Sequence, residues 1–158
     1  MKVMLIVPTL NYEHKQFKFL SMSDFPTGFA YIAAVLKEAG HEVIGVNLNN
    51  MTHYKTPYYM VVNELAYALS QHKPDLLGIG GICSNYPFLK DVIDTKRNIH
   101  PEIPIVLGGG IVTNDREFIF NLLKPDYAIT GEGEEAIVRL ANHEDKSQID
   151  NLSYWVDG

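Results

Sequence analysis

Short apolar runs alternate with longer amphipathic stretches along most of this chain. Apolar runs that end at Pro, Gly or a polar residue are typical of strands buried on both faces. Between the runs, apolar residues recur at the spacing of one helix face. The runs predict five strands, at residues 2–7, 42–47, 75–80, 105–107 and 126–130. The amphipathic stretches predict helices at 26–39, 58–72, 86–99 and 115–123, and a last one that opens at 131–135 and ends near 141.

Five strand–helix repeats predict a parallel sheet that is covered by helices on both faces. Right-handed crossovers favour the strand order 2-1-3-4-5 over other doubly wound arrangements. The expected fold is therefore α/β, a flavodoxin-like (Rossmann-like) five-stranded sheet. The inner face of the first helix would comprise Phe29, Ile32, Ala33 and Leu36, and that of the second Val61, Leu65, Ala68 and Leu69.

The last stretch, residues 143–158, lacks this pattern. It is charged at first and ends at Asp157-Gly158, a hairpin turn signal that no return strand follows. We therefore interpret residues 1–142 as the folded domain and 143–158 as the start of a linker to a downstream domain of a longer protein.

Composition narrows the classes of function. The 158 residues have a net charge of −6 and no basic cluster beyond Lys96-Arg97, which argues against nucleic acid as a partner. No apolar segment has the length of a signal peptide or a membrane span, so we expect a cytoplasmic protein that does not contact membranes. Cys83 is the single cysteine, which excludes a disulfide within the chain and fits a reducing compartment.

Four loops should meet at the carboxyl edge of the predicted sheet, where open α/β sheets bind their ligands. The most unusual is Gly108-Gly109-Gly110, directly after the fourth strand. Three glycines let a ligand lie against bare backbone, although a tight strand-to-helix turn would also need one or two. We expect Gly109→Val to abolish ligand retention without altering the fold.

Familiar ligands of this fold make demands that the loops do not meet. A dinucleotide fingerprint needs G-x-G-x-x-G after the first strand, but the first glycine there is Gly28. A flavodoxin phosphate loop needs several donors at a helix start, and Thr9 is the only hydroxyl next to that strand. A phospho-acceptor receiver needs an Asp at the end of the third strand, where this chain has 79–81, Ile-Gly-Gly.

Several motifs together resemble a known family. They are Pro26-x-Gly28-x-x-Tyr31-Ile32-Ala33-Ala34, the stretches 80–84 and 107–110, and Thr130-Gly131-Glu132-Gly133-Glu134. The chain resembles, over residues 1–142, the cobalamin-binding domain that precedes the catalytic domain of radical S-adenosylmethionine enzymes. The resemblance implies a corrin ring over the carboxyl edge and a nucleotide tail in a crevice beside strands one, three, four and five. The implied cofactor-binding residues are Pro8, Thr9, Gly81, Cys83, Ser84, Gly108, Gly109, Gly110, Gly131, Glu132 and Gly133.

Some of these residues have a second interpretation. Ser84 could offer its hydroxyl to the tail, cap the next helix, or do both, because Ser is a preferred N-cap. Glu132 could accept a hydrogen bond from a corrin amide. Glu134 and Glu135 are explained by the dipole of the helix that they open. Cys83 fits the role of a small packing residue.

Cobalamin domains that ligate cobalt from below use D-x-H-x-x-G after the first strand. The one histidine in that loop, His14, lacks the Asp and the Gly in register. We therefore expect cobalamin with its own base displaced, no histidine ligand, and no metal-ligating residue in this chain. Leu10 and Phe17 are candidates to cover the lower face of cobalt.

The family's enzymes hold a [4Fe-4S] cluster through C-x-x-x-C-x-x-C, which one cysteine cannot supply. The resemblance therefore implies that the cluster and S-adenosylmethionine bind a downstream radical domain of the same polypeptide, a methyltransferase or cyclase, and that this chain has no catalytic residue of its own. Two alternatives stay open: a flavodoxin-like binding or interaction domain with another ligand or none, and half of a nucleotide-sugar-type enzyme.

Overall fold

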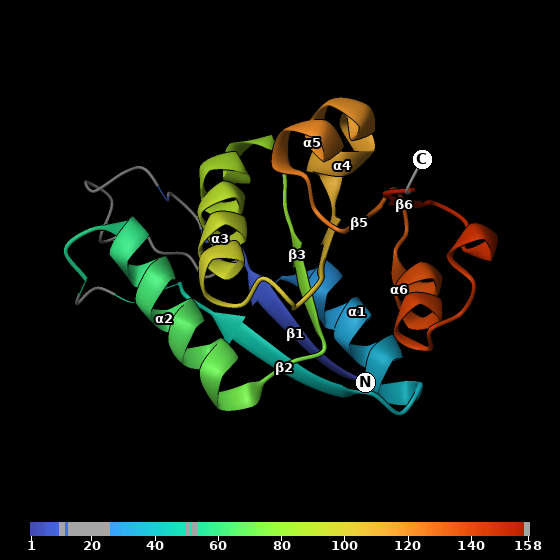
Figure 1. Cartoon of the computed structure of the whole chain (residues 1–158), viewed down its shortest axis with the longest axis horizontal. Coiled ribbons are helices and arrows are strands. Elements are labelled where there is room, and N and C mark those ends of the chain that lie inside the picture. Colours follow the sequence, from blue (N-terminus) through green and yellow to red (C-terminus); the bar gives the residue numbers. More distant parts are fainter. Residues whose placement is uncertain (10–11, 13–25, 50, 52–53, 157–158) are drawn as a thin grey trace.

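A six-stranded sheet forms the centre of the molecule, in the order β2-β1-β3-β4-β5-β6 (Figure 1). This computed structural model describes residues 1–9, 12, 26–49, 51 and 54–156. The strands are β1 (Lys2–Val7), β2 (Glu42–Asn47), β3 (Leu76–Gly80), β4 (Ile105–Gly108), β5 (Tyr127–Ile129) and β6 (Leu152–Tyr154). The first five are parallel, so the predicted order 2-1-3-4-5 is confirmed.

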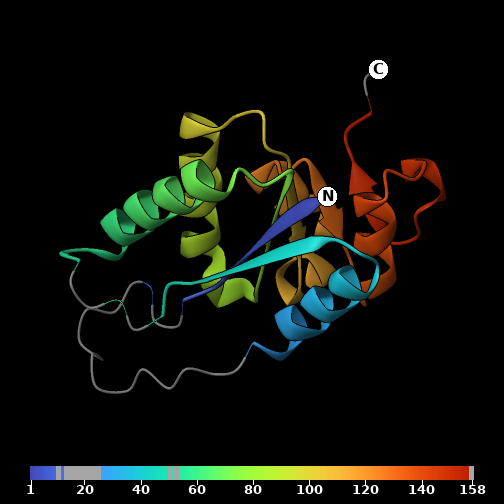
Figure 2. The same cartoon turned by 90° about the horizontal axis from the view of Figure 1, so that it is seen from below.

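Helices cover both faces of the sheet, as Figures 1 and 2 show. They are α1 (Thr27–Glu38), α2 (Pro57–His72), α3 (Tyr86–Ile99), α4 (Gly110–Asn114), α5 (Arg116–Leu123) and α6 (Glu134–Ala141). The helix predicted at 115–123 is confirmed as α5, and the short helix α4, which precedes it directly after β4, was not predicted. Asp115 separates α4 from α5: its backbone is not helical, with φ of −151° and ψ of 71°, and its carboxylate accepts a hydrogen bond from Phe118 N–H at 3.4 Å, which caps α5.

Alternate strand residues point to opposite helix layers, as the two-residue period of a strand requires. The layer with α2 and α3 buries, among others, Met4, Ile79 and Leu107. The layer with α1 and α6 buries Val3, Leu36, Val106 and Ile129 and has Phe29, Ile32 and Ala33 packed against it. The inner faces predicted for the first two helices are therefore confirmed.

The prediction of five strands is corrected by β6, which pairs antiparallel with β5. The chain around β6 packs on the domain: Ile149 is buried, and the Trp155 ring stacks on Phe120 with 4.5 Å between centroids. The indole Nε1 also donates to the Pro125 carbonyl at 2.8 Å. The role of 143–158 as the start of a linker stays a prediction, and its described part up to residue 156 contributes to this sheet.

None of the helices in the described residues is long and apolar enough to cross a bilayer.

Candidate functional site

A cavity of about 440 Å³ opens at the carboxyl edge of the sheet, on the face covered by α1 and α6. Small-molecule sites typically have volumes of about 300–1,000 Å³. Strands β1, β3, β4 and β5 all contribute to it, as the resemblance implied for the crevice. The lining residues are Leu5, Gly28, Phe29, Ile32, Gly78, Ile79, Gly80, Gly81, Ile82, Val106, Gly108, Gly109, Gly110, Ile129, Gly131, Glu132, Gly133, Glu134 and Ile137.

Glycines on one face of β3 and at the end of β4 line the cavity. Gly78 and Gly80 alternate with Ile79 in β3, and Gly108 follows Val106 by two residues in β4. Gly78 is paired with Val106 and Gly80 with Gly108, so these positions form adjacent rows on the same side of the sheet. Side chains on the opposite side fill the core. On this side, the Leu5 side chain lies over Gly78 and the Gly108 backbone lies against Gly80, so the open space is above Gly108.

The three consecutive glycines differ in what they do. A Cβ on Gly108 would have nothing nearer than the Ile129 carbonyl oxygen at 3.9 Å. Gly109 has φ of +86°, and its Cβ would lie 2.8 Å from the backbone oxygen of Gly81 and 2.9 Å from its nitrogen. The loops after β3 and β4 thus approach so closely that only glycine fits at Gly109. The expectation that Gly109→Val would leave the fold unaltered is therefore wrong.

The structure brings together most of the predicted site residues. Those that line the cavity are Gly81, Gly108, Gly109, Gly110, Gly131, Glu132 and Gly133. Pro8, Thr9, Cys83 and Ser84 are not among the described residues that line it, and their contact with a cofactor stays a prediction.

Three of these outlying residues have environments that the sequence did not indicate. The Pro8 carbonyl accepts a hydrogen bond from Asn49 at 3.2 Å. Cys83 is exposed, so its interpretation as a small packing residue is wrong. Ser84 is not the N-cap of α3 either: that position belongs to Asn85, whose side chain accepts from Ile82 N–H at 2.9 Å and fixes the turn after β3.

Sequence reasoning missed the helix side of the cavity. Gly28, Phe29 and Ile32 of α1 and Ile137 of α6 line it. Phe29 and Ile32 have the spacing of core residues, and the sequence offered no way to tell a core contact from a cavity wall. Gly28 did carry a signal, since it stands in one of the quoted motifs.

Thr113 was also missed, and it joins two of the cavity's loops. Its hydroxyl accepts from Gly131 N–H at 3.0 Å and donates to the Gly109 carbonyl at 3.3 Å. The side chain therefore links the loop after β4 to the loop after β5.

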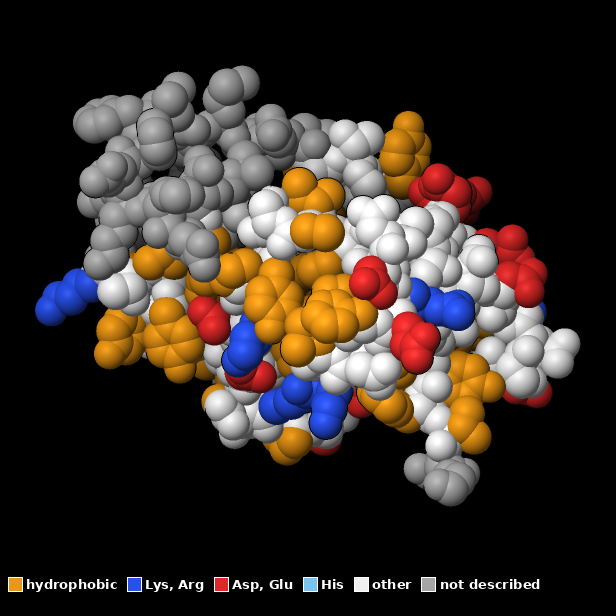
Figure 3. Space-filling model, turned by 90° about the horizontal axis from the view of Figure 1, so that it is seen from above, with side chains coloured by type: hydrophobic (Ala, Val, Ile, Leu, Met, Phe, Trp, Pro, Cys, Tyr) orange, Lys and Arg blue, Asp and Glu red, His pale blue; other side chains and the backbone are white. Residues whose placement is uncertain are grey.

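The charge at the cavity is acidic and lies at its mouth. Among the described lining residues, only Glu132 and Glu134 have polar side chains. Glu134 and Glu135 stand in the first turn of α6, where carboxylates favourably oppose the helix dipole, as the sequence predicted. In Figure 3, which views the carboxyl-edge side, hydrophobic side chains gather near the centre, with both acidic and basic side chains around them.

Between residues 10 and 25, in the loop from β1 to α1, the structure describes one residue, Tyr12. Its hydroxyl donates to Asp91 of α3 at 2.6 Å, and its ring packs edge-on against Phe88. Burial, followed by the hydrogen bond to Asp91, raises the pKa of Tyr12. His14, Leu10 and Phe17 lie outside the described residues. Within the described part of the chain, no three His, Cys, Asp or Glu side chains gather to hold a metal ion.

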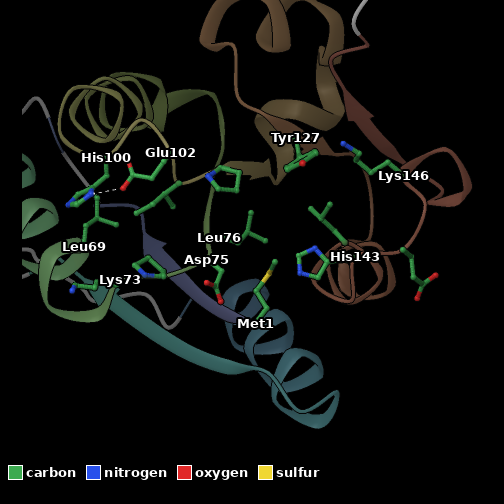
Figure 4. A pocket seen from close by; sticks show the side chains of 15 residues that line it. Met1, Leu69, Lys73, Asp75, Leu76, His100, Glu102, Tyr127, His143 and Lys146 are labelled. Carbon is green, nitrogen blue, oxygen red and sulfur yellow. Dashed lines mark hydrogen bonds and ion pairs between the residues drawn. The ribbon is translucent and has the colours of Figure 1, made fainter.

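A larger cavity, of about 960 Å³, lies at the opposite edge, around the amino ends of β3, β4 and β5 (Figure 4). Both acidic and basic side chains line this cavity, and its acidic side chains are hydrogen-bonded or ion-paired. Asp75 accepts from Lys2 N–H at 2.6 Å, Glu102 pairs with His100 at 2.9 Å, and Glu144 pairs with Arg139 at 2.8 Å. The hydrogen bond from His100 lowers the pKa of Glu102. Ligands of open α/β sheets bind at the other edge, so we take the smaller, glycine-lined cavity as the candidate site.

Comparison with known proteins identifies a family. The family profile described as B12 binding domain matches residues 25–141, which is most of the chain. A comparison with curated protein sequences finds no match.

Solved structures show where the same fold occurs. The radical S-adenosylmethionine methyltransferase TsrM from Kitasatospora setae, with tryptophan and an S-adenosylmethionine analogue bound, is 17% identical at a TM-score of 0.73, over 96% of this chain and 28% of that one. The cobalamin-dependent S-adenosylmethionine radical enzyme OxsB, with aqua-cobalamin bound, is 15% identical at 0.72, over 99% and 21%. UDP-GlcNAc 2-epimerase from Methanocaldococcus jannaschii is 12% identical at 0.50, over 94% and 44%. The chain spans less than half of each, and the likeness shows the fold.

Proposed function

The chain belongs to the B12-binding domain family, and we propose that its glycine-lined cavity holds the nucleotide tail of cobalamin while the corrin ring lies over the carboxyl-edge loops. The observation that supports this most is Gly108 at the end of β4. An added Cβ there would have nothing nearer than 3.9 Å, so bare backbone faces the cavity at the edge where this fold binds ligands.

The residues present fit such a cofactor. A flat base can pack between the backbone at Gly108 and the side chains of Phe29 and Ile32 across the cavity. The space above Gly108 is what a Cβ would fill. At the mouth, the Glu132 carboxylate can accept hydrogen bonds from the amides of a corrin. When bound, cobalamin supplies the cobalt chemistry, and these residues bind and orient it.

We further propose that the cofactor binds with its own base displaced from cobalt and with no histidine in its place. A base inserted in the cavity cannot also ligate cobalt. His14 is the one histidine between β1 and α1, and it lacks the Asp and Gly of the ligating motif. The visible spectrum of the chain with hydroxocobalamin tests this: we expect a base-off spectrum, and a histidine-ligated signature would contradict the proposal.

The parent protein is proposed to be a cobalamin-dependent radical S-adenosylmethionine enzyme, such as a methyltransferase or cyclase. Support comes from the fold likeness to OxsB and to TsrM, which has also been solved with cobalamin and a [4Fe-4S] cluster bound. The cluster and S-adenosylmethionine would belong to a domain downstream of residue 142, because this chain has a single cysteine. A C-x-x-x-C-x-x-C motif in the parent sequence would support this assignment.

Gel filtration tests the central proposal. The chain is mixed with hydroxocobalamin at micromolar concentration, and the eluted protein is examined for corrin absorbance. We expect the two to elute together. Loss of cobalamin would instead favour a binding domain for another ligand. Thermal stabilisation by a UDP-sugar, without retention of cobalamin, would favour the nucleotide-sugar alternative.

A further inference from the structure

The composition of the cavity bears on which cobamides the site accepts. Cobamides share the corrin ring and differ in the lower base of the nucleotide tail. In cobalamin the base is a dimethylbenzimidazole, which is largely apolar. In other cobamides it is a purine such as adenine, with more ring nitrogens and an exocyclic amine that all form hydrogen bonds in water.

We infer that the cavity selects among cobamides by the lower base, admitting a benzimidazole and discriminating against a purine. The inference rests on the proposed function and adds to it the chemical class of base that the site prefers. Its first support is the apolar surface that faces the space: Leu5 and Val106 on the sheet, Ile32 on α1 and Ile137 on α6.

The second support is that several backbone groups in the loops after β3 and β4 are already hydrogen-bonded within the fold. Gly81 N–H donates to the Gly108 carbonyl at 3.3 Å, and Ile111 N–H donates to the Gly81 carbonyl at 2.9 Å. The Gly109 carbonyl accepts from Val112 N–H at 3.0 Å. A purine that entered the cavity would lose its hydrogen bonds to water. These backbone groups would not replace them, because each already has a partner within the fold.

The third support is the position of the two carboxylates. Glu132 is in the loop after β5, and Glu134 is the first residue of α6, so both are at the mouth. Ile137 is almost one helical turn further along α6 and is 3% exposed. A base that passes the mouth therefore contacts methyl groups and glycine backbone, where unpartnered ring nitrogens lose their hydrogen bonds to water.

An unpaired buried polar group weakens binding by about tenfold or more. We therefore expect cobalamin to bind at least about tenfold more tightly than adeninylcobamide, because the purine places more than one such group in the cavity. Cobinamide, which has no lower base, should bind more weakly than cobalamin, since it leaves the cavity unused.

Equilibrium dialysis of the chain against each of these three corrinoids, followed by corrin absorbance, measures the preference. Equal affinity for cobalamin and adeninylcobamide would overturn the inference and leave the proposed function standing. Cobinamide binding as tightly as cobalamin would also overturn it, because the base would then lie outside the cavity. Binding of none of them would refute the proposed function itself.

A matched pair of variants assigns the preference to the cavity. Val106→Thr places a hydroxyl on its floor with little change of shape and should reduce the preference for cobalamin by at least about threefold. Val3→Thr makes the same change on the same face of the sheet, at a buried position that does not line the cavity, and should leave the preference unchanged. The inference fails if both variants keep the wild-type preference, or if both lose it equally.

Discussion

Replacing Gly108 should weaken cobalamin binding without harming the fold. The position is at the end of β4, has no atom within 3.9 Å of an added Cβ and lines the cavity. Gly108→Val would place its methyl groups where we expect the lower base. The free energy of unfolding of the protein without ligand should rise, because replacing a glycine in a strand stabilises the fold by about 0.5–1 kcal/mol.

The size of the expected loss of affinity follows from the cost of overpacking. Forcing extra carbon atoms into a filled site costs about 1–3 kcal/mol. Here only the complex with cobalamin is overpacked, so the dissociation constant of cobalamin should rise by about 5- to 150-fold. Gly108→Ala should show a smaller rise in the same direction.

The neighbouring glycine is the control. Gly109→Ala sets a Cβ 2.8 Å from the backbone of Gly81 at a φ of +86°. Left-handed backbone alone costs a non-glycine residue about 1–2 kcal/mol, so the melting temperature should fall by at least about 3 °C in a domain of this size. Equilibrium dialysis and thermal unfolding of both variants separate the effects. Wild-type affinity in Gly108→Val, or an unaltered melting temperature in Gly109→Ala, would refute this assignment of roles.

Three further outcomes are expected. Thr113→Val, which removes the link between two cavity loops, should weaken cobalamin binding by about 3- to 10-fold in dialysis, and Thr113→Ser should restore it. Deleting 143–158 should lower the free energy of unfolding by at least about 2 kcal/mol in urea titrations, because β6 and a buried isoleucine are lost; unaltered stability would contradict a structural role. Tyr12→Phe should cost about 1–2 kcal/mol at neutral pH through the lost bond to Asp91. Because the folded pKa of Tyr12 is raised, the wild type should lose this advantage above about pH 10, where the unfolded tyrosine ionises and binds fewer protons than the folded one.

The bounds of the strands could be predicted where a Pro or Gly next to a strand agrees with the apolar pattern within it. β1 stops before Pro8 and β2 follows Gly40, so both strands have the expected bounds. β6 was missed because it has three half-buried residues, too few for a period. The helix α4 was missed, because its start at Gly110 depends on the contact between two loops, which no local pattern encodes.

The glycine loops that line the cavity could be predicted from the sequence, and the side chains that line it from the helices could not. Clustered glycines after β3, β4 and β5 predicted the edge at which the glycine-lined cavity opens. The distinct roles of Gly108 and Gly109 depend on the distance to Gly81, a residue far away in sequence. The side chains that line the cavity from α1 have the same spacing as core residues, so a pattern of apolar positions could not separate the two.

The alternation of glycine with a large residue in β3 also makes the cavity sensitive to insertions. Adding one residue ahead of Gly78 would exchange the two sides of the strand, moving Ile79 into the cavity and opening a void in the opposite core. A single event would thus remove the binding site and destabilise the protein. An insertion of two residues in β3, by contrast, keeps each side chain on its own side of the sheet. Whether the number of inserted residues is odd or even therefore matters more to this domain than how many there are.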